Sequence, residues 1–119
     1  MKEFIISRKK SLKFAIKGMF LLLKTEQAII SHFFFSIIFI AMGFFFEISR
    51  MEWIVQLLLI GFVLTIEALN TVIEKLCDFI HPDHHSRIGF IKDISAGAVS
   101  FAVIFSLTIA FILYYPYFF

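Results

Sequence analysis

Long apolar runs separated by short polar connections divide the chain into four predicted helices. Residues 28–46 and 90–115 are almost wholly apolar, and residues 53–80 begin the same way before becoming more polar. Each run is close to or longer than the roughly 20 residues that a helix needs to cross a bilayer. Residues 7–24 instead interleave apolar and basic residues at helical spacing, as in a helix lying on a membrane surface. The pattern predicts an all-α membrane protein, with an N-terminal interfacial amphipathic helix and three transmembrane helices.

Aromatic residues and prolines mark the predicted ends of these spans. Trp53 and the C-terminal tyrosines stand where interfacial aromatic residues are favoured. Pro82 is expected to end the second span and Pro116 the third, because proline cannot donate the backbone hydrogen bond of a helix. The small residues of 95–100 would let helices approach closely in lipid. No repeat or linker is visible, so residues 1–119 are predicted to form a single membrane domain.

Composition and charge agree with a membrane location. Of the 119 residues, 61% are hydrophobic and eighteen are phenylalanine, and the mean hydropathy of +0.94 is too high for a soluble domain of this size. Basic residues concentrate before the first span, where they are expected to face anionic lipid and not nucleic acid. By the positive-inside rule, the N-terminus is predicted to be cytoplasmic and the C-terminus external. These basic residues are Lys2, Arg8, Lys9, Lys10, Lys13, Lys17 and Lys24.

Four polar residues form a stripe on the second predicted span: Glu67, Asn70, Glu74 and Asp78. Because an α-helix turns about 100° per residue, this spacing keeps them within an arc of roughly 80°. Ionisable residues inside a span cost about 2.5–3.5 kcal/mol on insertion scales and are usually functional. At about 1.5 Å per residue from Trp53, Glu67 lies roughly 21 Å into the membrane and Glu74 at its cytoplasmic face. The stripe therefore predicts a site that descends from the cytoplasmic surface into the lipid.

Further charged residues at the same face favour phosphoryl transfer. Glu26 opens the first span, and Lys92 and Asp93 open the third. Carboxylates at this level could hold Mg²⁺, which takes one or two carboxylates together with substrate phosphates. Lys92 could add positive charge to a transferring phosphoryl group, and Glu67 could accept a proton from a lipid hydroxyl. The pattern predicts transfer from a cytoplasmic nucleotide to a membrane alcohol, although neither a P-loop nor a protein-kinase motif is present.

Other interpretations stay open at this point. A small proton-coupled transporter would also carry intramembrane carboxylates, but these are expected near the midplane of the membrane. A structural or assembly protein would leave the acidic stripe without a role. The loop histidines 81, 84 and 85 could indicate zinc, yet no cysteine or second fixed pair supports such a site. Asp78 is also compatible with a solvated helix end, and His32 with an ordinary interfacial side chain.

The run E-A-L-N-T-V-I-E-K-L-C-D at 67–78, followed by I-K-D-I-S-A-G-A-V at 91–99, resembles the signature of the small bacterial membrane lipid kinases. These are the prokaryotic diacylglycerol kinases and undecaprenol kinases. The resemblance extends to Lys17-Gly18 and Glu26 and covers nearly the whole chain. It implies a lipid kinase that uses ATP and Mg²⁺ and works as a homotrimer, with sites shared between subunits, in the bacterial cytoplasmic (inner) membrane.

The resemblance also implies roles for individual residues. Glu67 matches the catalytic base that deprotonates the lipid hydroxyl, and Asn70 matches a supporting amide beside it. Glu26 and Glu74 match the acids that hold the Mg²⁺ accompanying ATP. The residues expected to bind ATP are Arg8, Glu26, Glu74, Asp78, Asp83, His84, His85, Lys92 and Asp93.

His32 bears on the identity of the lipid. It stands six residues after Glu26, where diacylglycerol-specific members tend to carry an acid. A histidine there, with I-S-R-M-E-W after the first span, resembles the undecaprenol-kinase branch. His32 and Ala96 are the residues expected to contact the lipid, and undecaprenol is favoured over diacylglycerol as the acceptor.

Overall fold

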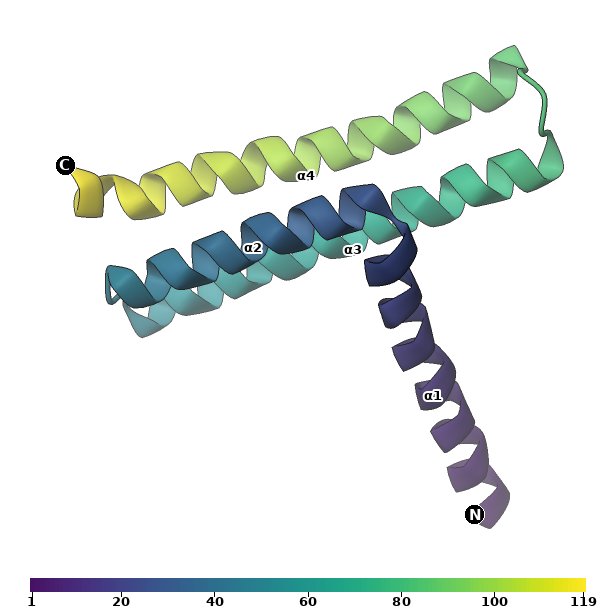
Figure 1. Ribbon diagram of the computed structural model, residues 1–119, viewed down its shortest axis with the longest axis horizontal. Helices are drawn as coiled ribbons and strands as arrows, with labels where there is room; N and C mark the ends of the chain where they lie inside the picture. The colour runs from purple at the N-terminus through teal and green to yellow at the C-terminus, as the bar shows by residue number, and fades with distance from the viewer.

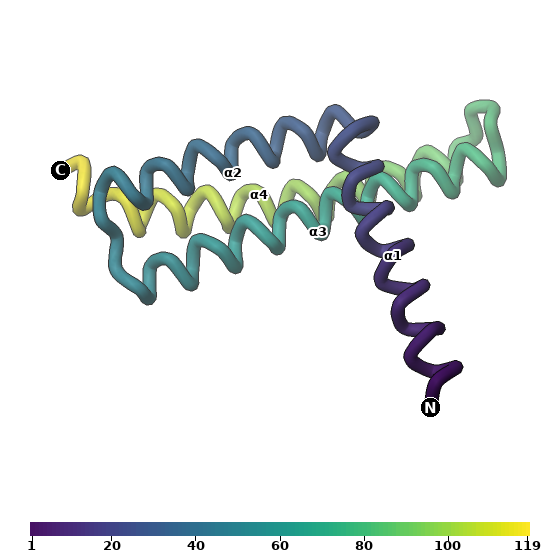
Figure 2. The backbone as a smooth tube through the Cα atoms, turned by 60° about the horizontal axis from the view of Figure 1, so that its bottom comes forward, coloured from purple at the N-terminus to yellow at the C-terminus, as the bar shows by residue number.

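The protein, described over residues 1–119 by a computed structural model, consists of four helices joined by short turns (Figure 1). They are α1 (Lys2–Thr25), α2 (Gln27–Phe45), α3 (Arg50–Ile80) and α4 (Ser86–Phe118). Helices α2, α3 and α4 run side by side, whereas α1 leaves the bundle and runs across their direction (Figures 1 and 2). By length and composition, α2, α3 and α4 are candidate membrane spans. The predicted all-α fold, with one N-terminal helix and three spans, is confirmed.

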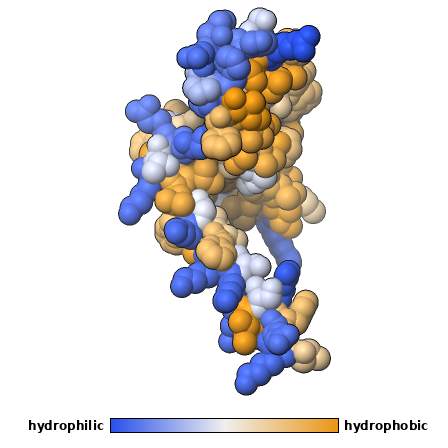
Figure 3. All heavy atoms as spheres, turned by 90° about the vertical axis from the view of Figure 1, so that its right-hand side faces the viewer, coloured by the Kyte–Doolittle hydropathy of each residue, from blue (hydrophilic) through white to orange (hydrophobic).

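Helix α1 lies apart from the bundle. The extended backbone of Glu26 separates α1 from α2 and changes the direction of the chain there. Helix α1 packs mainly against α2. None of its residues is buried, and all its basic side chains are exposed in the single protomer, whereas Leu22 and Leu23 next to α2 are half-buried. It begins at Lys2, earlier than the predicted residue 7, because residues 2–6 contain no proline or glycine that would stop a helix. Its mixed surface is visible in Figure 3 and suits a membrane interface.

A capping box sets the start of α3. The backbone N–H of Glu52 donates to Ser49 Oγ at 3.2 Å, and the backbone N–H of Ser49 donates to Glu52 Oε1 at 2.9 Å. This reciprocal pair satisfies two backbone donors that the first turn would leave free. The helix therefore begins at Arg50, three residues before the predicted start at Trp53.

Helix α4 is longer at both ends than its predicted range of 90–115. At its start, the His85 ring accepts a hydrogen bond from the backbone N–H of Arg87, so the helix begins at Ser86. At its end, the prediction that Pro116 stops the helix is wrong, because α4 continues to Phe118. Proline removes one backbone donor, but so close to the end of the helix little structure depends on that bond. The N–H of Phe119 still reaches the carbonyl of Tyr115 at 3.1 Å.

Buried polar groups join three helices at the end of the bundle opposite the α3–α4 turn. Gln56 on α3 donates through Nε2 to the carbonyl of Phe39 on α2 at 3.1 Å. The hydroxyl of Tyr114 on α4 donates to Gln56 Oε1. Gln56 and Tyr114 are each only 4% exposed, and Ile48 and Leu113 are buried nearby. This set of hydrogen bonds therefore fixes the position of α4 against the α2–α3 hairpin.

Close packing between α2 and α3 depends on Gly43. A Cβ atom at this position would lie 2.7 Å from the ring of Trp53 and 3.2 Å from Gln56 Nε2. Both distances are shorter than ordinary van der Waals contact between carbon and its neighbours. The absence of a side chain at Gly43 thus gives Trp53 and Gln56 the room that they occupy.

Replacing Tyr114 with phenylalanine should destabilise the protein, because Gln56 Oε1 would lose its donor in apolar surroundings. The expected loss is about 0.6–2 kcal/mol, the range found for hydrogen bonds between membrane helices. Thermal unfolding in detergent would measure it. Tyr115→Phe is the matched control, since Tyr115 is 51% exposed. Equal unfolding midpoints for the two variants would contradict the role of the Tyr114 hydroxyl.

Candidate active site

The polar stripe lies near the level at which α1 leaves the bundle. Lys75 on α3 contacts Glu26 at 3.0 Å between Nζ and Oε1, so this part of α3 lies beside the α1–α2 junction. At about 1.5 Å per residue, Glu67 lies roughly 12 Å deeper into the bundle and Asp78 roughly 5 Å toward the α3–α4 turn. The α3–α4 hairpin extends past the α1–α2 junction, as Figures 1 and 2 show. The stripe thus passes from buried to exposed surroundings.

Glu67 is the buried end of the stripe. Glu67 is only 6% exposed, and its Oε2 lies 3.4 Å from Nε2 of His32 on α2. The neighbouring Thr71 is also buried and donates its hydroxyl to the backbone carbonyl of Glu67 at 3.1 Å. The polar face of α3 carries no basic partner for this acid, and α2 supplies one in His32. A carboxylate in these surroundings can take a proton from a hydroxyl that reaches it.

Asn70 connects the buried part of the stripe with its exposed part. Its Nδ2 donates to Glu74 Oε1 at 3.2 Å, and its Oδ1 accepts from the hydroxyl of Ser95 at 2.7 Å. Asn70 and Ser95 are buried, whereas Glu74 is exposed. Sequence reasoning missed Ser95, which it treated only as a small residue for helix packing. A hydroxyl in a small-residue run close to Lys92 and Asp93 was the available signal.

The α3–α4 turn forms a polar cleft of about 250 Å³. An ion pair between Lys92 Nζ and Asp78 Oδ1 bridges α4 and α3 beside it. Hydrophilic residues gather at this turn, above a largely apolar bundle, in the view of Figure 3. Lysine and histidine N–H groups are suitable donors for phosphate oxygens. Five of the predicted ATP-binding residues line the cleft: Asp78, Asp83, His84, His85 and Lys92.

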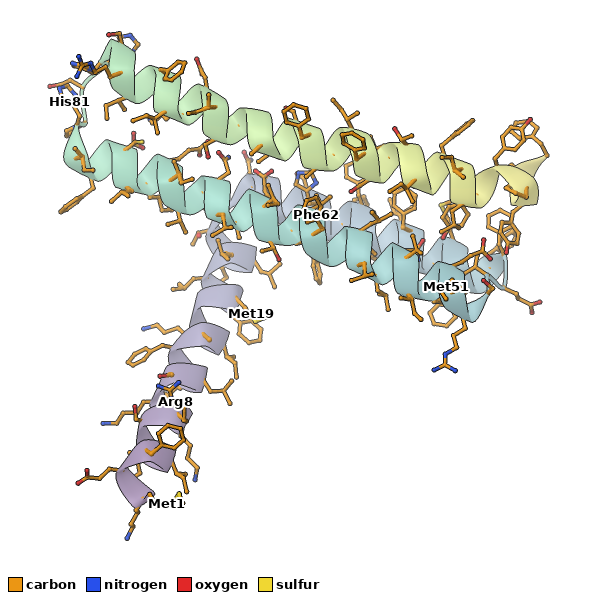
Figure 4. All side chains as sticks on the ribbon, turned by 180° about the vertical axis from the view of Figure 1, so that it is seen from behind. Met1, Arg8, Met19, Met51, Phe62 and His81 are labelled. Carbon is orange, nitrogen blue, oxygen red and sulfur yellow. The ribbon has the colours of Figure 1, made fainter.

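The other four predicted ATP-binding residues do not line this cleft: Arg8, Glu26, Glu74 and Asp93. Arg8 lies well along α1, away from the turn at His81 (Figure 4), and its guanidinium stands 5.5 Å from the ring centre of Phe4. Asp93 and Ala96 are exposed on α4 and line neither the cleft nor the groove described below. In a single protomer, Arg8 therefore has no route to the rest of the site.

The acids predicted to hold Mg²⁺ lie at one level of the bundle, Glu26 at the α1–α2 junction and Glu74 on α3. Glu26 precedes α2, and Glu74 is the neighbour of Lys75, which contacts Glu26. No group of three or more histidine, cysteine, aspartate or glutamate side chains is arranged to hold a metal ion by itself. Two carboxylates nevertheless suit Mg²⁺, which commonly completes its shell with substrate phosphates and water.

An apolar groove of about 340 Å³ lies between α2, α3 and α4. His32 lines one part of it, and Gln56 and Tyr114 line the part toward the C-terminal end of α4. Most of its other lining side chains are apolar, including Val63 and Leu107. The groove is therefore suited to a hydrocarbon chain, and a polar head group at its His32 end would lie close to Glu67.

Sequence comparison places this arrangement among known proteins. The family described as prokaryotic diacylglycerol kinase matches residues 13–114. Undecaprenol kinase of Bacillus subtilis (strain 168) is 34% identical over 107 residues, which cover 90% of this chain and 87% of that protein. The family match includes every candidate site residue described above except Arg8.

Proposed function

Given that the chain belongs to the prokaryotic diacylglycerol kinase family of membrane lipid kinases, we propose that Glu67 is the general base for phosphorylation of a membrane alcohol by ATP. The observation that carries this proposal is the burial of the Glu67 carboxylate next to His32, where the apolar groove ends. A lipid chain in the groove would present its hydroxyl to this carboxylate. Membership of a kinase family also excludes the proton-coupled transporter that the acidic stripe left open.

The reaction assigns a separate task to each part of the site. Glu67 takes the proton of the lipid hydroxyl, and the lipid oxygen attacks the γ-phosphorus of ATP. The bond from this phosphorus to the β,γ-bridging oxygen breaks, and ADP leaves with the electron pair. Lys92 stabilises the charge of the transferring group. Asn70, fixed by Ser95, holds the Glu74 carboxylate at the exposed part of the stripe.

Glu26 and Glu74 are the residues that would hold Mg²⁺. When bound, the ion would neutralise the phosphate charge and align the γ-phosphoryl group. The contact of Glu26 with Lys75 keeps this acid at the level of Glu74 before nucleotide arrives. Two carboxylates with nucleotide phosphates match the usual preference of Mg²⁺.

We assign the nucleotide to the polar cleft at the α3–α4 turn. Lys92 and the loop histidines supply donors there, and Asp93 lies one residue beyond Lys92 on the same helix end. Arg8 would reach the nucleotide only from another subunit, because α1 points away from the cleft of its own protomer. We therefore propose that α1 of one subunit completes the site of the next, in the homotrimer that the family resemblance implies.

The same assignment sets the orientation of the chain in the bacterial cytoplasmic (inner) membrane. ATP is cytoplasmic, so the α3–α4 turn and α1 would lie inside the cell. The α2–α3 turn and the C-terminus would then lie outside. The excess of basic residues in α1 agrees with this orientation by the positive-inside rule.

Undecaprenol is our proposed acceptor. A polyprenol offers one hydroxyl and no ester groups, so it needs few polar contacts besides His32 and Glu67. The matched kinase of Bacillus subtilis is named for the same lipid. Ala96, exposed on α4, would contact the lipid from outside the groove.

Glu67→Gln should reduce turnover about a hundredfold or more, because the amide keeps the size of the side chain but cannot act as a base. Membrane insertion should be retained, since an intramembrane charge is removed. The measurement is ATP-dependent phosphorylation of lipid alcohol by purified protein. Glu47→Gln, at the exposed α2–α3 turn, is the control. Near-normal turnover in a well-inserted Glu67→Gln protein would show that another group is the base.

Glu26→Gln and Glu74→Gln should each raise the apparent KM for Mg²⁺–ATP, because each removes a negative ligand from the ion. Titrations of Mg²⁺ and ATP at saturating lipid would measure the change. The KM for lipid should stay close to that of the unmodified protein. A selective loss of lipid affinity with unchanged nucleotide binding would contradict this assignment.

Undecaprenol should be phosphorylated with a higher kcat/KM than diacylglycerol when both are supplied in matched mixed micelles with radiolabelled ATP. The ratio should be modest, because hydrocarbon contacts are nearly equivalent in lipid and only a few polar contacts discriminate. Efficient phosphorylation of diacylglycerol with none of undecaprenol would overturn the choice of acceptor and leave the kinase activity standing.

A further inference from the structure

The proposed reaction leaves a proton on a buried side chain in every turnover. The side chain of Glu67 is only 8% exposed, so water has little access to it. Of the neighbouring polar groups, Thr71 bonds to the backbone of Glu67 and Asn70 is engaged with Glu74 and Ser95. Hydroxyl and amide groups are poor proton acceptors. The carboxylate therefore needs another group to return it to its charged form.

We propose that His32 accepts this proton from Glu67 and so restores the base after each transfer. Its Nε2 lies 3.4 Å from Glu67 Oε2, and no other ionic partner contacts this carboxylate. An imidazole nitrogen is both a proton acceptor and, once protonated, a donor. This inference rests on the proposed role of Glu67 as the base. His32 itself does not react with the substrate and acts only by deprotonating Glu67.

His32 is less enclosed than the acid that it contacts. The side chain of His32 is 28% exposed, more than three times as much as that of Glu67. Its backbone carbonyl accepts a hydrogen bond from the Ser36 hydroxyl at 2.7 Å. Six residues of α2 separate it from Glu26, about 9 Å along the helix axis. His32 thus stands between the buried acid and the level at which phosphate and water are expected.

The distance of 3.4 Å is longer than a strong hydrogen bond. Catalytic contacts are often long without substrate and tighten when it binds. A lipid chain entering the groove would pack beside the ring, since His32 lines that groove.

The proton balance is simple. The lipid hydroxyl proton moves to Glu67 as the phosphoryl group transfers, and the protonated carboxyl then gives it to Nε2 of the neutral imidazole. The imidazolium then gives one proton to water or product phosphate on the cytoplasmic side of the site and becomes neutral again. One proton leaves for each phosphoryl group transferred, and no other bond to His32 forms or breaks.

The test compares His32→Gln and His32→Ala in the purified full-length protein with undecaprenol and ATP. Each variant should lose about tenfold or more in kcat, because proton return would become slow. Imidazole added to His32→Ala should raise kcat with concentration, since it can occupy the vacated space and carry the proton. Phe34→Ala is the control for lost volume on α2, because Phe34 is 60% exposed. It should keep its activity and show no response to imidazole.

The outcomes separate this inference from the proposed base. Two results together support both roles, Glu67 as base and His32 as proton acceptor. Imidazole restores the activity of His32→Ala, and Glu67→Gln stays inactive with or without imidazole. Normal kcat in folded His32→Gln, or a defect confined to the KM for lipid and insensitive to imidazole, overturns the inference and leaves Glu67 as the base. An active Glu67→Gln overturns the base and this inference together.

Discussion

Inside a bilayer, a polar group has no water to bond, so its partners must come from the protein itself. Helix α3 meets this requirement by pairing three of its four buried polar residues with another helix, while Thr71 bonds to the backbone of α3 itself. Gln56 bonds to α2 and α4, Glu67 contacts α2, and Asn70 bonds to α4. Apolar contacts discriminate weakly between arrangements of helices in lipid. These few polar contacts therefore determine how the three spans sit against one another.

The sequence predicts the helices well because the signals for them are local. Apolar runs and basic periodicity identify one interfacial helix and three spans, and the spacing of the acids identifies the polar stripe. The errors at helix ends have local causes too. The Ser49–Glu52 capping box is readable as S-x-x-E, and Pro116 falls where a missing donor matters little.

The partners of the site residues could not be predicted in the same way. Two contacts between helices illustrate this: His32 with Glu67, and Ser95 with Asn70. Both depend on the axial register of one helix against another. No periodicity within a single helix contains that information. The position of Arg8 shows the same limit at a larger scale, because its distance from the α3–α4 turn follows from the direction of α1.

The helices differ in length, and this difference bears on how the depth of the site in the membrane is set. Helix α2 has 19 residues, a length of about 28 Å, whereas α3 and α4 have 31 and 33. If α1 rests on one leaflet as we propose, the Lys75–Glu26 contact would place Glu67 at a depth that is set from that leaflet and not from the opposite one. A thicker or thinner membrane would then be accommodated at the far end of the bundle, by tilt or local deformation of the lipid. The reacting hydroxyl and the buried acid would keep the same depth below the headgroups in bilayers of different thickness.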